Sequence, residues 1–311
     1  MILCCGEALI DMLPRVSTAG EACFAPYAGG AVFNTAIALG RLGTPAGFFS
    51  GVSTDMLGEI LADTLTASKV DTSLLARSDR PTTVAFVKLT DGQASYAFYD
   101  EATAGRMLAT TDLPALPDRV QALFFGGISL VNDPAAASYE ALLAREAGRR
   151  LIMIDPNIRP GFIAGQEATY RARISRMIAQ SDIVKLSDED LHWLEGAGET
   201  EALAARLLAQ GPALVLITEG AEGARAFSAG GSRRRPAGKV TVVDTVGAGD
   251  TFNAGFLAGL AREGALSRAR LAGLTAAQTD ACLDLGIRAA GVTVSRAGAN
   301  PPWAHEIGLC G

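Results

Sequence analysis

Short apolar segments alternate with longer amphipathic ones along most of this 311-residue chain, and this alternation constrains its fold more than any other feature. Strands that alternate with helices favour a doubly wound, mostly parallel α/β sheet flanked by helices, with ligands bound at the carboxyl ends of the strands. We find no internal repeat or low-complexity linker, so we predict a single domain over residues 1–311. The expected strands are 1–10, 47–52, 122–125, 151–155, 183–186 and 214–218, with 224–227 and 240–243 at a mixed edge. The expected helices are 31–42, 55–67, 135–149, 169–180, 189–195, 201–209, 249–262 and 275–290.

Two stretches depart from this alternation and predict a second, small sheet. Residues 12–28 contain prolines and a glycine, which suits a ribbon of edge strands outside the main sheet. Residues 83–89 and 94–99 are two β-rich runs separated by Asp91-Gly92, a dipeptide typical of a hairpin turn. We interpret the segments at about 12–28 and 82–105 as a lid inserted into the domain.

Composition and charge exclude several classes of function. A net charge of −6 gives no electrostatic footprint for nucleic acid. The basic run at 233–235 lies among glycine, serine and proline, which predicts a solvated loop. Five cysteines without C-x-x-C spacing and two isolated histidines argue against a disulfide framework, a zinc site or a Ser-His-Asp triad. We see no signal peptide and no apolar run of about 18 residues, so we expect a cytoplasmic protein without a membrane partner.

The sequence D-T-V-G-A-G-D-T-F at 244–252 follows a β-branched run at 239–243 and opens an apolar helical pattern. Gly247 and Gly249 free the backbone to turn sharply and leave amide N–H groups uncovered. The helix N-terminus carries partial positive charge, and Asp250 adds a carboxylate there. An anion cradle with a base beside it suits transfer of a phosphoryl group to an alcohol. Taken alone, G-x-G-D is explained equally well as a helix cap.

Polar side chains follow several of the expected strands. Parallel strand ends share one edge of a sheet, so together they indicate one crevice, although each alone is more often a turn or a cap. Gly29, Gly30 and Asn34 begin a helix near that edge, where a small polyol could receive hydrogen bonds. No P-loop, dinucleotide-binding or protein-kinase signature occurs, so a phosphate site late in the chain needs a different fold. The polar strand ends are Asp11 and residues 155–159, 185–187 and 218–220.

Three motifs together resemble the ribokinase-like (PfkB-type) carbohydrate kinases. They are the glycine motif at 244–252, A-G-G-A-x-F-N-x-A at 28–36 and D-P-N-I-R at 155–159. The resemblance covers essentially the whole chain and is strongest to bacterial fructokinases. That subgroup is indicated by F-Y-D-E-A-T-A-G-R-M-L at 98–108, K-L-S-D-E-D at 185–190 and S-R-x-G-A-N-P-P at 295–302.

The resemblance implies a role for each matching residue. Asp250 matches the catalytic base that removes the proton from the attacking sugar hydroxyl. The backbone of Gly247, Ala248 and Gly249 matches the anion hole that steadies the transferred phosphoryl group. The residues expected at the sugar are Asp11, Gly29, Gly30, Asn34, Tyr99 and Arg159. Those expected on the nucleotide side are Lys185, Ser187, Thr218, Gly220, Gly223 and Ala289.

The resemblance also implies ATP as the phosphoryl donor, with Mg²⁺ and, in some members, K⁺. The family often carries N-x-x-E after the strand that holds Lys185, whereas Ser187 and Asp190 occupy those places here. Serine can still donate a hydrogen bond and aspartate can still order metal-bound water, so we expect magnesium dependence to persist, with Asp190 acting through water. Asp244 resembles part of a monovalent-cation site.

The expected activity is ATP-dependent phosphorylation of a small neutral sugar at a primary hydroxyl, with D-fructose giving the 6-phosphate. Sugar-acid kinases of the family, such as those for 2-keto-3-deoxygluconate, tend to place an arginine after the lid tyrosine. Here Tyr99 is followed by Asp100 and Glu101, which would repel a carboxylate. Arg106 and Arg159 keep the sugar acid open as an alternative substrate.

Two further expectations concern the class of function and the oligomeric state. A non-catalytic sugar-binding protein on the same fold is the alternative from another functional class, because a fold does not determine a function. Exposed lid strands present unpaired backbone N–H and C=O groups at their edges, and pairing between two copies would satisfy these groups. The sequence therefore predicts a homodimer through the lid.

Overall fold

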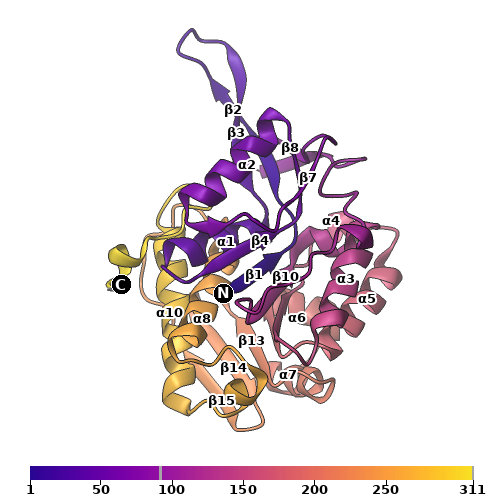
Figure 1. The fold of residues 1–311 in the computed structure, drawn as a ribbon. Coiled ribbons are helices and arrows are strands. Elements are labelled where there is room, and N and C mark those ends of the chain that lie inside the picture. The colour runs from indigo at the N-terminus through magenta and orange to yellow at the C-terminus, as the bar shows by residue number, and fades with distance from the viewer. Residues whose placement is uncertain (91–92, 310–311) are drawn as a thin grey trace.

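In the computed structural model, residues 1–90 and 93–309 are described, and within them the larger sheet has nine strands (Figure 1). Its order is β15-β14-β13-β12-β11-β10-β1-β4-β6, and neighbours from β13 through to β6 pair in parallel, while β14 and β15 are antiparallel. This confirms the doubly wound, mostly parallel sheet. The strands are β1 Ile2–Cys5, β4 Ala46–Phe49, β6 Val70–Asp71, β10 Ala122–Gly126, β11 Leu151–Asp155, β12 Ile183–Ser187, β13 Leu214–Thr218, β14 Ala224–Ser228 and β15 Gly231–Arg235.

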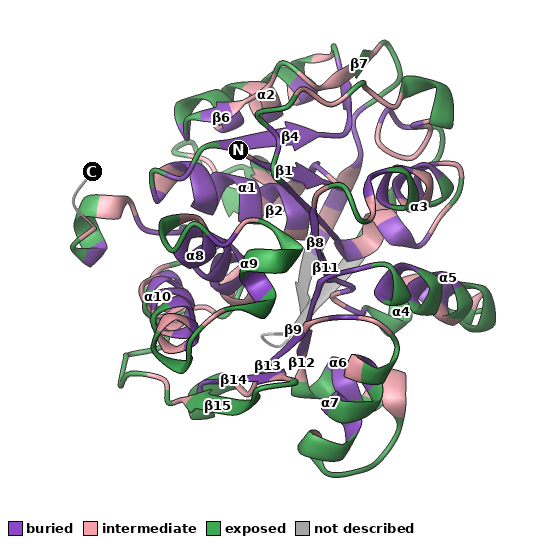
Figure 2. Cartoon of the chain, turned by 60° about the horizontal axis from the view of Figure 1, so that its bottom comes forward, coloured by how far each residue is buried: buried purple, intermediate pink, exposed green. Residues whose placement is uncertain are grey.

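Helices cover both faces of this sheet, so its strands lie between two apolar layers (Figure 2). Successive residues of β1 show why: Ile2 and Cys4 pack with α1, α2, α8 and α10, whereas Leu3 and Cys5 pack with α3, α5 and α7. Among the described residues, no helix is both long and apolar enough to cross a membrane. The helices are α1 Ala31–Arg41, α2 Met56–Ala67, α3 Ala135–Glu146, α4 Pro160–Ile163, α5 Glu167–Ala179, α6 Asp188–Glu195, α7 Thr200–Ala209, α8 Ala248–Arg262, α9 Arg268–Ala272 and α10 Ala276–Val294.

The lid forms a second sheet of four strands in the described part of the chain, in the order β3-β2-β8-β9. The hairpin of β2 and β3 projects from the molecule (Figure 1). The predicted turn at Asp91-Gly92 lies outside the described residues. The lid strands are β2 Leu9–Val16, β3 Ala22–Gly29, β8 Val84–Thr90 and β9 Gln93–Tyr99, and a separate pair is β5 Gly51–Ser53 with β7 Ala76–Ser78.

The first predicted strand, 1–10, is wrong in its extent. The chain leaves the large sheet after β1 and enters the lid sheet at β2, with only residues 6–8 between them. At Gly6 a Cβ would lie 2.5 Å from Cγ2 of Val32, so α1 packs directly on the backbone at this junction. Asp11 therefore does not end a core strand but lies inside lid strand β2.

The prediction at the far edge of the sheet is also wrong. Residues 240–243 form no strand, and Val242 and Val243 are exposed. The basic run predicted as a solvated loop instead forms β15. Arg233 and Arg235 donate hydrogen bonds of 2.9 and 2.7 Å to Asp280 and Asp284 of α10. These contacts attach the strand to a helix. A prediction from β-branched residues cannot detect them, because they depend on tertiary packing.

Candidate active site

The glycine motif forms a left-handed turn at the start of α8. Gly247 precedes the helix with φ of 76°, and a Cβ there would lie 2.8 Å from Cβ of Ala299, so only glycine fits without strain. The first amides of an α-helix have no acceptor within the helix. The amide of Ala248 donates to the carbonyl of Thr245 at 3.3 Å. The turn therefore presents a helix N-terminus directly beside Asp250, as the sequence predicts.

Asp250 lies in the first turn of α8 and is buried, with 7% of its surface exposed. Its Oδ2 accepts a hydrogen bond of 2.9 Å from the side-chain amide of Asn34 in α1. Burial raises the pKa of Asp250 to about 7, with smaller contributions from the negative charges of Asp155 and Glu7. An aspartate with such a pKa is a competent proton acceptor near neutral pH, unlike an exposed one.

We expect kcat to rise with pH through a midpoint near 7, because proton removal from an alcohol requires the ionised form of Asp250 and its pKa is raised to about 7. The acid limb of the profile under saturating substrates measures this pKa. A kcat that stays constant between about pH 5 and 8 would contradict the assignment, because an unperturbed aspartate titrates near 3.9.

A buried polar cluster lies next to the glycine turn. Nζ of Lys185 in β12 contacts Oδ2 of Asp155, at the end of β11, at 2.9 Å, and the side-chain amide of Asn253 donates to the same oxygen at 2.7 Å. A Cβ at Gly249 would lie 3.1 Å from that Nζ. Lys185 therefore holds a positive charge against the first turn of α8.

Sequence reasoning did not single out Asn253, and it placed Asp155 among the polar strand ends of the crevice without giving it a role. The signal for Asn253 was its spacing: three residues after Asp250, it lies on the same face of the helix. Its amide oxygen is buried and has no hydrogen-bond partner within the described residues. Asp155 follows a strand, and its side chain is enclosed by Lys185 and Asn253. Only the tertiary packing reveals this enclosure.

The predicted sugar residues Asp11, Gly29, Gly30 and Asn34 lie together where the lid meets α1. Leu9 of β2 pairs with Gly29 of β3, and a Cβ at Gly29 would lie 2.6 Å from Oδ2 of Asp11. Burial raises the pKa of Asp11 to about 6. Gly30 has φ of 114° directly before the first residue of α1.

The register of the lid separates Tyr99 from these residues. Asp11, Ala85 and Phe98 stand opposite one another across β2, β8 and β9, so they share one face. Tyr99 therefore points to the other face, where it is 62% exposed and contacts Phe86 edge to face. The structure does not bring Tyr99 to the predicted sugar residues. Phe98 lies on their face instead.

Phe98 links the lid to the main body of the protein. Its ring lies 4.9 Å, centroid to centroid, from the ring of Phe162 in α4. Arg159 begins that short helix and is exposed, and its guanidinium donates to the neighbouring carbonyl of Ile158 at 3.0 Å. A cavity opens between the lid and the body, with Phe98, Phe162 and Glu7 among its lining residues.

The residues predicted on the nucleotide side lie at adjacent strand ends. Ser187 and Thr218 stand opposite each other at the ends of β12 and β13, and the hydroxyl of Ser187 accepts from the amide of Asp190 at 3.0 Å. Burial raises the pKa of Asp190, and the nearby charge of Asp155 raises it further.

Four other predicted residues have defined surroundings in the structure. A Cβ at Gly223, where φ is 100°, would collide with the carbonyl of Arg235, and Gly220 has φ of 55° in the same turn. Ala289 is fully buried in the core on α10. The carboxylate of Asp244 accepts from the amides of Val246 and Gly298 at 3.0 and 2.8 Å.

Asp100, the first acid after the lid tyrosine, makes side-chain contacts through both of its carboxylate oxygens. One oxygen of Asp100 accepts from the hydroxyl of Thr83 at 2.9 Å, and the other faces Arg106 at 3.4 Å. Arg106 also donates to the carbonyl of Asp133 at 3.0 Å. These contacts direct Arg106 toward Asp100 and the body of the protein.

The fold and the site are those of a ribokinase-like kinase, which is a class of phosphotransferase. A family model described as "pfkB family carbohydrate kinase" matches residues 1–306, and the chain belongs to that family. The enzyme is therefore an ATP-dependent carbohydrate kinase.

Individual proteins agree with this classification. The chain is 60% identical over 274 residues to a fructokinase from Rhizobium leguminosarum bv. trifolii, covering 88% of this chain and 84% of that protein. A fructokinase with bound ATP from Xylella fastidiosa has 28% identity and a TM-score of 0.88 over 98% of this chain and 96% of that one. A fructokinase double mutant from Vibrio cholerae O395, with fructose, ADP and potassium ion bound, has 25% identity and a TM-score of 0.82 over 96% and 93%.

Proposed function

We propose that this enzyme phosphorylates D-fructose at its 6-hydroxyl with ATP, and that Asp250 is the base. The observation that carries the proposal is the position of Asp250: a buried carboxylate held by Asn34 in the first turn of a helix that begins with a glycine turn. The similarity to fructokinases over most of the chain supports fructose as the sugar. Because ATP is the donor, we assign this activity to the cytoplasm.

The proposed reaction is an in-line transfer. The sugar hydroxyl oxygen attacks the terminal phosphorus of ATP, the bond from that phosphorus to the bridging oxygen breaks, and ADP leaves with the electron pair. Asp250 accepts the hydroxyl proton. The amides at 247–249 and the charge of Lys185 stabilise the negative charge on the transferred group. The lid, with Phe98 against Phe162, excludes water from the reaction.

Two cations complete the proposal. The described residues contain no group of three or more histidines, cysteines, aspartates or glutamates that could hold a metal, so the fit is to a Mg²⁺ carried mainly by ATP and water. Asp190, in the first turn of α6 with its amide on the hydroxyl of Ser187, fits such a site as an acid that acts through water. Bound Mg²⁺ would neutralise phosphate charge. Asp244 is our candidate for K⁺, because its two carboxylate oxygens accept hydrogen bonds from the amides of residues 246 and 298 and so lie between these two backbone segments.

A neutral sugar fits the site better than a sugar acid. Asp100 adds negative charge to the cavity beneath Phe98, and Arg106, which could otherwise pair with a carboxylate, already faces Asp100 and the carbonyl of Asp133. Arg159 forms no ion pair with any of the described residues, so 2-keto-3-deoxygluconate is the second candidate substrate.

The test is ADP release with ATP and Mg²⁺ against a panel of sugars. Fructose should give the highest kcat/KM, and 2-keto-3-deoxygluconate should be a poor substrate. A higher kcat/KM for the sugar acid would reverse the substrate assignment. No ADP release above the sugar-free background with any sugar would refute the proposed catalysis and favour a sugar-binding protein.

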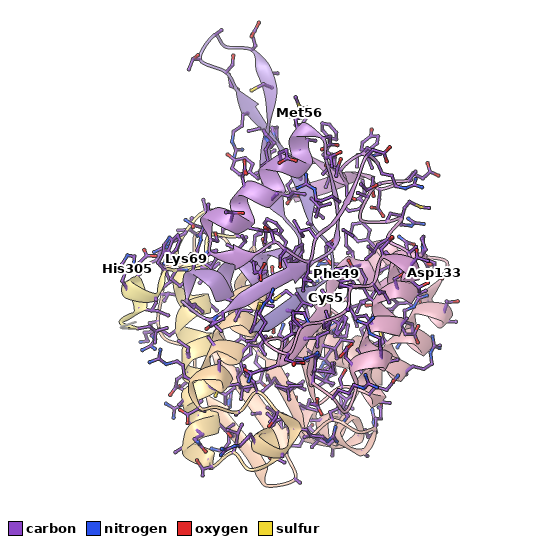
Figure 3. All side chains as sticks on the ribbon, in the orientation of Figure 1. Cys5, Phe49, Met56, Lys69, Asp133 and His305 are labelled. Carbon is purple, nitrogen blue, oxygen red and sulfur yellow. The ribbon has the colours of Figure 1, made fainter. Side chains whose placement is uncertain are left out.

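We also propose that two copies pair through the outer face of the lid. Val16, Phe24 and Tyr99 lie on the face opposite Asp11 and are 73%, 52% and 62% exposed, and Phe86 joins the two rings edge to face. Met56, at the start of α2, lies beside the lid and is 80% exposed (Figure 3). A second copy would cover these side chains and the edge strands β3 and β9.

Light scattering at micromolar concentration should therefore give the mass of a dimer, and Phe24→Asp should give a monomer. Val240→Asp is the matched control, because Val240 is 45% exposed but lies beside Gly291 of α10, outside the lid. A parent protein that is monomeric at this concentration, or a dimer that survives Phe24→Asp, would contradict pairing through this face.

A further inference from the structure

Glu7 is a buried acid at the junction between the two sheets, and the proposed mechanism gives it no role. It lies in the short link between β1 of the large sheet and β2 of the lid. Its Oε1 accepts from the amide of Ala31 at 2.9 Å, and its Oε2 accepts from the amide of Ser129 at 3.3 Å. One carboxylate thus joins three segments: the link, the start of α1 and the short helix η2 (Gly127–Leu130).

Two positions that contact Glu7 have room only for glycine. Gly127 has φ of 68°, and a Cβ there would collide with the Glu7 carboxylate. Gly30 has φ of 114°, and a Cβ there would lie 2.9 Å from the Glu7 carbonyl oxygen. Two glycines at positive φ, a conformation that other residues rarely adopt, therefore make room for this one residue.

The contacts of Glu7 lead directly to Asp250. Ala31 is the first residue of α1, and Asn34, one turn later on the same helix, donates to Asp250 at 2.9 Å. On its other side Glu7 lines the cavity beneath the lid, together with Phe98 and Asp100. Glu7 thus connects the helix that orients the base with the lid.

We propose that Glu7 is a positioning residue for phosphoryl transfer, which holds the start of α1 so that Gly30 meets the sugar and Asn34 orients Asp250. The inference rests on the proposed function of Asp250. Glu7 does not touch the reacting atoms. It acts through α1, and small displacements of a reacting group can lower a rate by about 10²-fold.

Glu7→Gln tests this role. Glutamine offers one acceptor oxygen in place of two, so either Ala31 or Ser129 would face its NH₂ group. We expect kcat to fall about 10- to 100-fold and KM for fructose to rise, with KM for ATP unchanged. A loss of stability alone would not raise one KM and leave the other unchanged.

Ala31→Pro is the second variant and keeps Glu7 itself. Proline is accepted at the first position of a helix. It removes the N–H that donates to Glu7 and puts a ring carbon in its place, so the Glu7 carboxylate can no longer hold the start of α1. It should reproduce the effects on kcat and on KM for fructose. Glu146→Gln is the control, because Glu146 is also a buried acid but pairs with Arg145 and Arg150 on α3 and after it. Melting temperatures of all variants separate stability from activity.

The outcomes are distinguishable. If the parent enzyme phosphorylates fructose and both Glu7→Gln and Ala31→Pro keep kcat and KM within about twofold, the positioning role is refuted. The same refutation follows if Glu146→Gln, at an equal melting temperature, loses as much kcat. If Glu7→Gln does not fold, Ala31→Pro decides alone. A parent enzyme inactive on every sugar contradicts the proposed function instead.

Discussion

Asp250→Asn is expected to lower kcat by roughly 10²- to 10⁴-fold, the range usually supplied by one positioned acid or base. Asparagine keeps the size of the side chain and can still accept from Asn34, so the fold and both KM values should change little. The loss arises because an amide does not take the hydroxyl proton. Initial rates of ADP release with fructose measure the effect, and circular dichroism verifies the fold.

This variant separates catalysis from stabilisation of the helix start. Gly247 is the N-cap of α8, and Asp250 lies in its first turn, where a carboxylate that only interacts with the helix dipole could be replaced by asparagine at a cost of about 0.3–1 kcal/mol in stability. Near-full turnover by folded Asp250→Asn would therefore show that the carboxylate only stabilises the helix start and that another group takes the proton.

Lys185→Met is expected to lower the free energy of unfolding by about 3–5 kcal/mol, because it leaves Asp155 buried without its counter-charge. The two side chains are 5% and 2% exposed, and their atoms are 2.9 Å apart, so water cannot replace the lost partner. Asn253 alone would remain as a donor to the oxygen that Lys185 contacts. Urea denaturation at neutral pH measures the loss.

The double variant Lys185→Met with Asp155→Asn is the matched control. It removes both charges, so it should recover much of the stability that Lys185→Met alone loses. Its kcat should stay low, since the positive charge beside Gly249 is gone. A single variant within about 1 kcal/mol of the parent would contradict the account of this pair.

The core of the fold could be predicted because its strands are buried on both faces. Runs such as residues 151–155 and 214–218 are continuous and apolar, and the observed β11 and β13 match them. The errors fall where local pattern and packing disagree. The apolar run 1–10 crosses from one sheet to the other, and the valines at 240–243 have no strand partner. Arg233 lies in a strand whose arginines pair with acids of α10, Arg233 with Asp280 and Arg235 with Asp284.

The candidate site was predictable only where a motif marks it. The glycine motif at 244–252 predicts Asp250, and the motif at 28–36 predicts Asn34. In the structure a hydrogen bond joins these two side chains. Phe98 was missed in favour of Tyr99 because a shift of one residue reverses the face of a strand, and only the register with Asp11 decides it. Glu7 was missed because its partners are 24 and 122 residues away.

The central claim is that the amides at 247–249 hold the terminal phosphate of ATP while Asp250 deprotonates the sugar. A crystal structure of Asp250→Asn with fructose and ATP tests it most directly, since the slow variant preserves both substrates. We expect the terminal phosphate within about 3.2 Å of those amides and the 6-hydroxyl within the same distance of the side chain at position 250. A phosphate bound away from Gly249, with the side chain at 250 turned from the sugar, would contradict the account.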